Sequence, residues 1–304
     1  MKNDENLSEE KIKYYGHDTY LISDTPVPRG YNYHYLPECN LSQNKPNPKI
    51  DLETVIHEWK ECSIILWQRL WNNPSAILHN YPYSFYVCDL GPQVSKNIPL
   101  VSFRSNQNDV YWAILPTCRE ENILVTLGVK PETKAEEELL DTLDNMTTFG
   151  TSPFSDKSDI YKHFKKTAFG SNPSQKTTQI RHVTPNGNLI TETVYVENFK
   201  NYLDKTIQKG KKIDMLWINI ESGDLDYWKY LGTDQKFDQW EIVVCQINIE
   251  VKIEDGEQFE QFMKPIFSSL KWMYFRPSFS HDHQFVRSFL LNVHDEACIR
   301  KYLQ

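Results

Sequence analysis

The residues best suited to hold a cofactor follow a short apolar run, ILVTLGV, at 123–129. Gly128 is the last residue but one of this run, and Lys130 and Pro131 come directly after it. In a parallel sheet, cofactors bind where strands end and helices begin, and a glycine there lets the backbone come close to the ligand. A single glycine followed by lysine and proline also fits an ordinary connection between a strand and a helix. The turn is therefore a candidate cofactor loop, with an ordinary connection as its alternative.

A second candidate segment follows another apolar run, IDMLWINI, at 213–220. Asn219, Glu221 and Asp224 lie at or just beyond its end. Carboxylates and amides at a strand end are well placed to orient a substrate or to move a proton. The alternative is structural, because Ser222 fits the N-cap of a helix with Asp224 in its first turn.

A third segment, Gln246-Ile247-Asn248-Ile249-Glu250, alternates polar and apolar residues. Its polar side chains point to one face of a strand, so they are candidates to line the same crevice. An edge strand with one solvent-facing side has the same pattern.

Metal binding is not expected. His281 and His283 offer two ligands, whereas zinc needs three or four, and no further cluster with metal-site spacing accompanies them. The sequence also has no G-x-S-x-G motif and no phosphate-binding P-loop. Hydrolases and nucleoside triphosphatases of those types are therefore excluded.

Strands that alternate with helices must position these residues. Such alternation predicts a doubly wound α/β sheet. We expect strands at 123–129, 178–183, 189–196, 213–220, 241–252 and 285–293. A further, weaker strand is expected to end at Phe149. We expect helices at 51–70, from Pro131 onward, and at 156–166, 197–208, 258–269 and 295–303. The hairpin signal Pro185-Asn186-Gly187 and the last strand predict antiparallel additions at the edges.

The composition fits a folded protein without broad nucleic-acid or membrane binding. The 304 residues carry 33 Lys and Arg against 41 Asp and Glu, a net charge of −8, and 13% of them are aromatic. Nucleic-acid binding depends on clustered cations, and a membrane helix needs about 20 apolar residues, so neither is expected. The first twenty residues show no secretory signal. Six cysteines without a C-x-x-C pair predict reduced, buried thiols. These features favour a cytoplasmic protein, with a nuclear one as the alternative.

The first 50 residues differ from the rest in their proline- and tyrosine-rich sequence. They predict an extended N-terminal arm, followed by an α/β domain over 51–304 whose core begins near 120. The arm is the expected contact for a protein partner.

Five segments in order resemble the FkbM family of methyltransferases, and within it the nematode-type form. They are ILVTLGVKPETKAEEEL, TTFGTSP, KIDMLWINIESGD, VVCQINIEV and FLLNVHDEACIRKYL. The resemblance covers about 120 to the C-terminus. It implies a Rossmann-like fold of the S-adenosylmethionine methyltransferase type, which methylates a hydroxyl group.

The resemblance implies that Gly128, Lys130, Glu136 and Ser152 line the cofactor site. Gly128 and Glu136 match the family pattern. Lys130 replaces a second glycine of the loop, and Ser152 replaces the acid that would hold the ribose hydroxyls.

The resemblance also implies catalytic positions at Asn219, Glu221 and Asp224. Glu221 matches the later family motif, Asn219 replaces its first acid, and Asp224 stands in for a second glutamate. An asparagine cannot act as a base, and a neutral serine binds hydroxyls more weakly than a carboxylate.

These departures predict a catalytically impaired or inactive methyltransferase-like domain that acts as a binding or scaffold module. The alternative is an active S-adenosylmethionine-dependent O-methyltransferase with a variant pocket.

Overall fold

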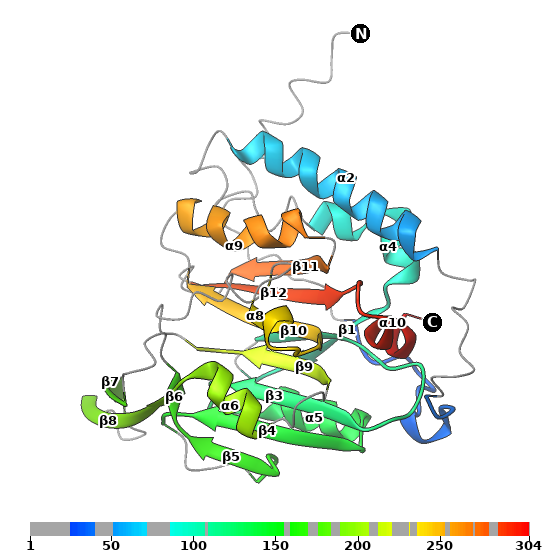
Figure 1. Ribbon diagram of the computed structural model, residues 1–304. Helices are drawn as coiled ribbons and strands as arrows, with labels where there is room; N and C mark the ends of the chain where they lie inside the picture. Colours follow the sequence, from blue (N-terminus) through cyan, green and yellow to red (C-terminus); the bar gives the residue numbers. More distant parts are fainter. Residues whose placement is uncertain are drawn as a thin grey trace.

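A seven-stranded sheet forms the centre of the structure (Figure 1). The computed structural model describes residues 25–39, 51–71, 86–106, 109–154, 159–169, 176–183, 189–206, 212–220, 231, 236–252, 256–269, 271–279 and 285–303. The central strands, in spatial order, are β11 (Trp272–Phe279), β12 (Phe285–Asn292), β10 (Val244–Lys252), β9 (Ile213–Ile218), β3 (Asn122–Leu127), β4 (Met146–Ser152) and β5 (His163–Lys166).

The remaining strands form two small sheets. They are the pair β1 (Leu100–Arg104) and β2 (Val110–Ile114), and the group β6 (Ala168–Phe169), β8 (Leu189–Glu197) and β7 (Thr177–Val183). The helices are η1 (Tyr33–Tyr35), α2 (Leu52–Trp71), α4 (Pro92–Asn97), α5 (Lys134–Thr142), α6 (Phe199–Thr206), α8 (Lys236–Gln239), α9 (Gly256–Ser268) and α10 (Glu296–Tyr302).

The strand order is that of a methyltransferase-type Rossmann-like fold. Strands β5, β4, β3, β9 and β10 pair in parallel, and β12 pairs antiparallel with both β10 and β11. The doubly wound α/β fold predicted from the sequence is confirmed. The expected antiparallel strand is β12, which lies one position inside the edge.

Each face of the sheet is covered by different elements. One face packs with α2, α6, α9 and α10, as shown by the cluster that joins Val125 and Leu216 to Trp59 and Phe262. The other face packs with α5 and the β1–β2 hairpin, through Leu124, Met215, Trp217, Leu139 and Phe103. The apolar runs of β3 and β9 are buried along their whole length because both faces are covered.

Strand β5 corrects one prediction. The helix expected at 156–166 is wrong, since residues 163–166 form β5 beside β4, and residues 155–158 lie outside the described part. This edge strand is mostly exposed, so it lacks the apolar run that would identify it. The helix expected from Pro131 begins at Lys134 instead.

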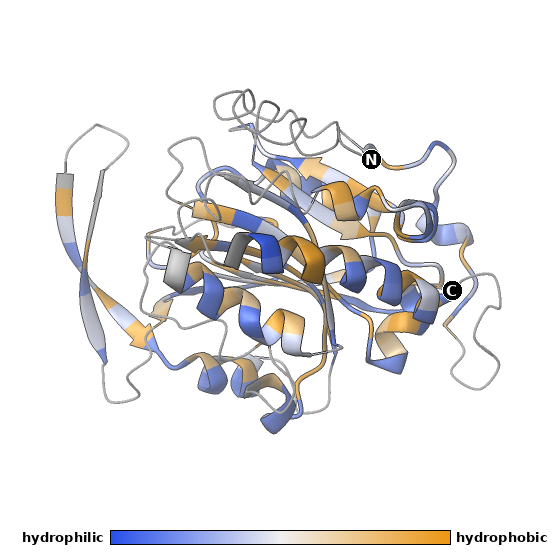
Figure 2. Cartoon of the chain, turned by 90° about the horizontal axis from the view of Figure 1, so that it is seen from above, coloured by the Kyte–Doolittle hydropathy of each residue, from blue (hydrophilic) through white to orange (hydrophobic). Residues whose placement is uncertain are grey.

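A two-stranded ribbon of β7 and β8 extends away from the sheet (Figure 2). Both strands were expected, whereas the turn at 185–187 lies outside the described residues. Tyr195 is 72% exposed on this ribbon.

Part of the N-terminal arm lies against the domain. Tyr33 is buried, and its hydroxyl donates a hydrogen bond to the carbonyl of Glu120. The backbone N–H of Ser102 donates to the carbonyl of Thr25 at 2.8 Å.

The six cysteines form three disulfides, so the expected reduced thiols are wrong. The pairs are Cys39–Cys118, Cys62–Cys88 and Cys245–Cys298. Their partners are 79, 26 and 53 residues apart in sequence, and Cα atoms come within 5.0–5.6 Å only through the fold. Each bond joins separate elements: the arm to the domain, α2 to the chain before α4, and β10 to α10.

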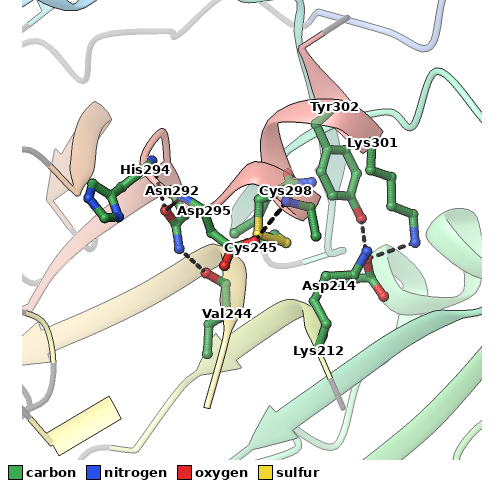
Figure 3. Close-up of a disulfide and its surroundings, with 12 residues drawn as sticks. Lys212, Asp214, Val244, Cys245, Asn292, His294, Asp295, Cys298, Lys301 and Tyr302 are labelled. Carbon is green, nitrogen blue, oxygen red and sulfur yellow. Dashed lines mark hydrogen bonds and ion pairs between the residues drawn. A yellow bond between two sulfur atoms is a disulfide. The ribbon is translucent and has the colours of Figure 1, made fainter. Parts of the chain in front are cut away.

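At the amino end of the sheet, α10 is held in several ways (Figure 3). Besides the bond between Cys245 and Cys298, the Asn292 amide donates to the carbonyl of Val244 at 2.9 Å. Asp295 caps the helix by accepting from the N–H groups of Ala297 and Cys298.

Candidate functional site

The three candidate segments meet at the carboxyl ends of β3, β9 and β10. Parallel pairing of β3 with β9 and of β9 with β10 brings these ends to one edge of the sheet. The backbone N–H of Asn219 donates to the carbonyl of Leu127 at 2.8 Å, so the first two segments are in direct contact. Glu221 and Asp224 lie outside the described residues.

Gly128 adopts a backbone conformation that favours glycine. Its φ is +80°, and a Cβ atom there would lie 2.5 Å from the carbonyl oxygen of Asn219. The N–H groups of Gly128 and Val129 both donate to the carbonyl of Thr151, at 2.9 and 2.7 Å. The turn is therefore packed tightly against β4 and the end of β9.

We expect Gly128→Ala to lower the free energy of unfolding by about 2–3 kcal/mol, because it combines a left-handed backbone with a clash against backbone atoms. Gly30→Ala is the matched control, since Gly30 has φ +88° but nothing within 4 Å of an added Cβ. The control is expected to cost about 1 kcal/mol. Urea denaturation measures both, and equal losses would contradict the tight packing at Gly128.

Lys130 turns into the crevice and joins three other charged side chains. Its Nζ lies 3.0 Å from Oδ2 of Asp109 and 3.1 Å from Oε2 of Glu250. Arg287 contacts the same two acids, with Nη1 2.5 Å from Oδ1 of Asp109 and Nη2 2.7 Å from Oε2 of Glu250. We call Asp109, Lys130, Glu250 and Arg287 the charge cluster. Two acids balance two bases, and each side chain is at least 79% buried.

Little space remains beside the charge cluster. The cavity there has a volume of about 10 Å³ and is partly open to solvent; its lining includes Tyr111, Trp112, Asn219, Asn248, Arg276 and Arg287. That volume accommodates about one water molecule. Pockets for small ligands have about 300–1,000 Å³.

Glu136 and Ser152 are both buried next to the turn. The hydroxyl of Tyr161 donates to the Glu136 carboxylate at 3.2 Å, and burial raises the pKa of Glu136 to about 7. The Ser152 hydroxyl accepts from the N–H of Phe154 at 3.3 Å. The Tyr161 ring lies against Gly150, where an added Cβ would come within 2.8 Å of it. These residues therefore make contacts within the protein that support the turn.

Gln246 and Asn248 hold the β1–β2 hairpin on the sheet. The Asn248 amide accepts from the N–H of Trp112 and donates to its carbonyl, both at 2.8 Å. Gln246 makes the same pair of bonds to Ile114, at 2.8 and 3.0 Å. The edge-strand alternative is wrong, because β10 lies between β9 and β12. Glu250, the third polar residue of this segment, belongs to the charge cluster.

Sequence reasoning missed Asp109, Arg276 and Arg287. Arg287 had a usable signal, since it is a charged residue inside the apolar strand FVRSFLLN. No sequence pattern distinguishes Asp109 and Arg276 from ordinary loop residues.

Among the residues described, no group of three or more His, Cys, Asp or Glu side chains is placed to hold a metal ion. His281 and His283 lie outside that part of the chain.

Two of the described residues differ from what the resemblance implies for an S-adenosylmethionine site. The loop position that is glycine in the family pattern carries Lys130, whose side chain is held in the crevice by two acids. The strand end expected to hold the ribose carries a serine instead of a carboxylate. The cavity beside the charge cluster, which has room for about one water, is lined by neither Lys130 nor Ser152.

No helix in the described segments combines the length and apolar character that crossing a bilayer requires.

Comparison with known proteins identifies the family. Residues 73–298 match the methyltransferase FkbM domain, which is about three quarters of the chain. No curated protein and no solved structure matches. The match includes every strand of the seven-stranded sheet and the crevice at its carboxyl edge. The chain belongs to the FkbM methyltransferase family.

Proposed function

We propose that this protein is a catalytically impaired member of the family that acts as a binding or scaffold module. The observation that supports the proposal is the charge cluster, in which Asp109 and Glu250 hold Lys130 directly after the expected cofactor turn. Asn219, directly after β9, also favours impaired catalysis, because an asparagine cannot accept a proton as a carboxylate does.

The energetics of the cluster support this function. A cofactor that displaced Lys130 would leave Asp109 and Glu250 with Arg287 as their remaining partner in the cluster. Removing one partner from a buried ion pair costs about 3–5 kcal/mol. Because Arg287 still compensates both acids, the cost of displacing Lys130 is smaller than this, and it acts against cofactor binding.

Calorimetric titration with S-adenosylmethionine and S-adenosylhomocysteine tests the proposal. We expect no detectable binding at millimolar cofactor, with an active methyltransferase as the positive control. Binding in the micromolar range would overturn it.

The alternative is an active S-adenosylmethionine-dependent O-methyltransferase with a variant pocket. It is favoured by Gly128, which retains the positive φ of a close-approach turn after the central strand. In this case Gly128, Lys130, Glu136 and Ser152 would hold the cofactor, and Asn219, Glu221 and Asp224 would serve the reaction. The same titration separates the two functions.

A protein partner for the N-terminal arm is part of the proposal. Because Tyr33 and Cys39 tie residues 25–39 to the domain, the informative variant lacks residues 1–24 only. Loss of a stable partner in a pull-down with this variant supports the arm as its contact, and no partner for either chain counts against it.

We also propose that the protein folds in an oxidising compartment. Three disulfides, with every cysteine paired, are typical of such compartments and rare in the cytosol. The cytoplasmic location expected from the sequence depended partly on reduced cysteines, and the disulfides remove that support.

A further inference from the structure

One surface asparagine begins a motif that the proposed function does not use. Asn145, Met146 and Thr147 form the sequence N-x-T, in which the asparagine is the acceptor of N-linked sugars. Asn6 and Asn40 begin N-x-S motifs of the same kind, and both lie outside the described residues. Asn145 is therefore the acceptor whose surroundings the structure shows.

Asn145 lies in the turn between α5 and β4, at the amino edge of the central sheet. Helix α5 ends at Thr142 and β4 begins at Met146, and Asn145 is exposed between them. N-linked sugars are bulky and occur at the protein surface, so an acceptor must have such a position. The crevice at the ends of β3, β9 and β10 is at the opposite edge of the sheet. Sugars on Asn145 would therefore leave that crevice open.

The fold uses the backbone of Asn145 and not its side chain. Its carbonyl accepts a hydrogen bond from the N–H of Asn122 at 3.0 Å. None of the described residues forms a hydrogen bond or an ion pair with the Asn145 side chain. Asparagine is common in turns because its side chain bonds to nearby backbone, and that structural role is missing here among those residues. The amide nitrogen Nδ2 is thus free to be modified without the loss of a contact in the fold.

The rest of the motif is also accessible. Thr147 is half-buried, and its hydroxyl donates to Oε1 of Glu121 at 2.9 Å in an exposed contact. The middle residue must not be proline, and here it is Met146. Asn73 and Asn172 are each followed by Pro-Ser, so the same rule excludes them as acceptors.

The disulfides place this motif where it can be used. N-linked sugars are found on secreted proteins, and the compartment that such proteins pass through also forms disulfides. All six cysteines of the chain are paired. The inference below rests on the oxidising compartment proposed above, and it does not depend on whether the crevice binds a cofactor.

We infer that Asn145 is an N-glycosylation site. In the transfer, Nδ2 of Asn145 forms a bond to the first carbon of an N-acetylglucosamine residue, which is supplied by a lipid-linked oligosaccharide diphosphate. The bond between that carbon and the diphosphate oxygen breaks, and the diphosphate leaves with the electron pair. The amide nitrogen loses one proton. The step therefore needs no oxidant or reductant.

Peptide mapping of the full chain, produced in insect cells, tests the inference. Peptide N-glycosidase converts a glycosylated asparagine to aspartate, and in water enriched in heavy oxygen it labels that aspartate. We expect the label at position 145 in most chains, and none when the enzyme is omitted. Thiol titration of the same sample reads the compartment separately. Unmodified Asn145 in chains with paired cysteines overturns the inference alone, whereas six free thiols overturn the compartment and the inference together.

Variants identify the motif as the signal for the modification. Asn145→Gln keeps the bond between Thr147 and Glu121, and Thr147→Val removes the hydroxyl of the motif. Each is expected to lower the mass of the intact chain by one oligosaccharide, whereas Thr147→Ser keeps the hydroxyl and the sugar. Asn201→Gln is the matched control, because Asn201 is exposed and is followed by Tyr-Leu. A full label at position 145 in Thr147→Val would show that the motif does not direct the modification, and this result overturns the inference.

Discussion

Replacement of Lys301 by methionine is expected to lower the free energy of unfolding by about 3–5 kcal/mol. Lys301 and Asp214 are each 1% exposed, and Nζ of Lys301 lies 2.7 Å from Oδ1 of Asp214. Methionine keeps the length of the side chain but leaves the buried carboxylate with only the more distant Lys212, whose Nζ lies 3.5 Å from Oδ1 of Asp214, as a cation partner. The hydroxyl of Tyr302 and the N–H of Ile123 still donate to Asp214, at 2.8 and 2.9 Å.

Lys134→Met is the matched control for this prediction. Lys134 forms an exposed pair with Glu138 at 3.8 Å, and such pairs contribute about 0.5 kcal/mol or less. Urea denaturation of both variants measures the difference. The contact between Lys301 and Asp214 joins α10 to the amino end of β9. If Lys301→Met lowered the free energy of unfolding by less than about 1 kcal/mol, this contact would not be needed to compensate Asp214.

Removal of the bond between Cys39 and Cys118 is expected to cost about 4 kcal/mol. The two residues are 79 positions apart, and closing so long a loop restricts the unfolded chain strongly. The variant replaces both cysteines with alanine, so that no free thiol remains from the pair.

Urea denaturation of this variant and of the natural sequence, with and without reductant, measures the contribution. The two chains are expected to differ without reductant and to become similar once all disulfides that remain are reduced. Thiol titration of the denatured, unreduced natural chain is expected to find none of the six cysteines free. Six titrating thiols would contradict the disulfides and the oxidising compartment inferred from them.

The sequence predicted the inner strands of the sheet because their burial leaves a clear pattern. The runs at β3 and β9 are apolar along their length, since helices or the hairpin cover both faces. The outer strand β11 was missed because Pro277 and Arg276 interrupt it, and proline usually argues against a strand. The bulge at this edge of the sheet accommodates the proline.

The site was predictable in position but not in its contacts. Because parallel strands have their carboxyl ends at the same edge of the sheet, Gly128, Asn219 and Glu250 were expected to lie near one another. The partners of Lys130 lie 21 and 120 residues away, and one of them belongs to a hairpin that has no helix–strand alternation to identify it. Whether a lysine in that loop points outward or into the crevice depends on those distant acids. The disulfides were missed for the same reason, since their pairing exists only in the folded chain.

In the proposed function, Lys130 occupies the space that a cofactor would need. A crystal structure of the protein grown with millimolar S-adenosylhomocysteine tests it most directly. We expect Lys130 Nζ within hydrogen-bond distance of Asp109 and Glu250, with no cofactor density at the ends of β3 and β9. Density for S-adenosylhomocysteine there, with Lys130 displaced from both acids, would contradict it.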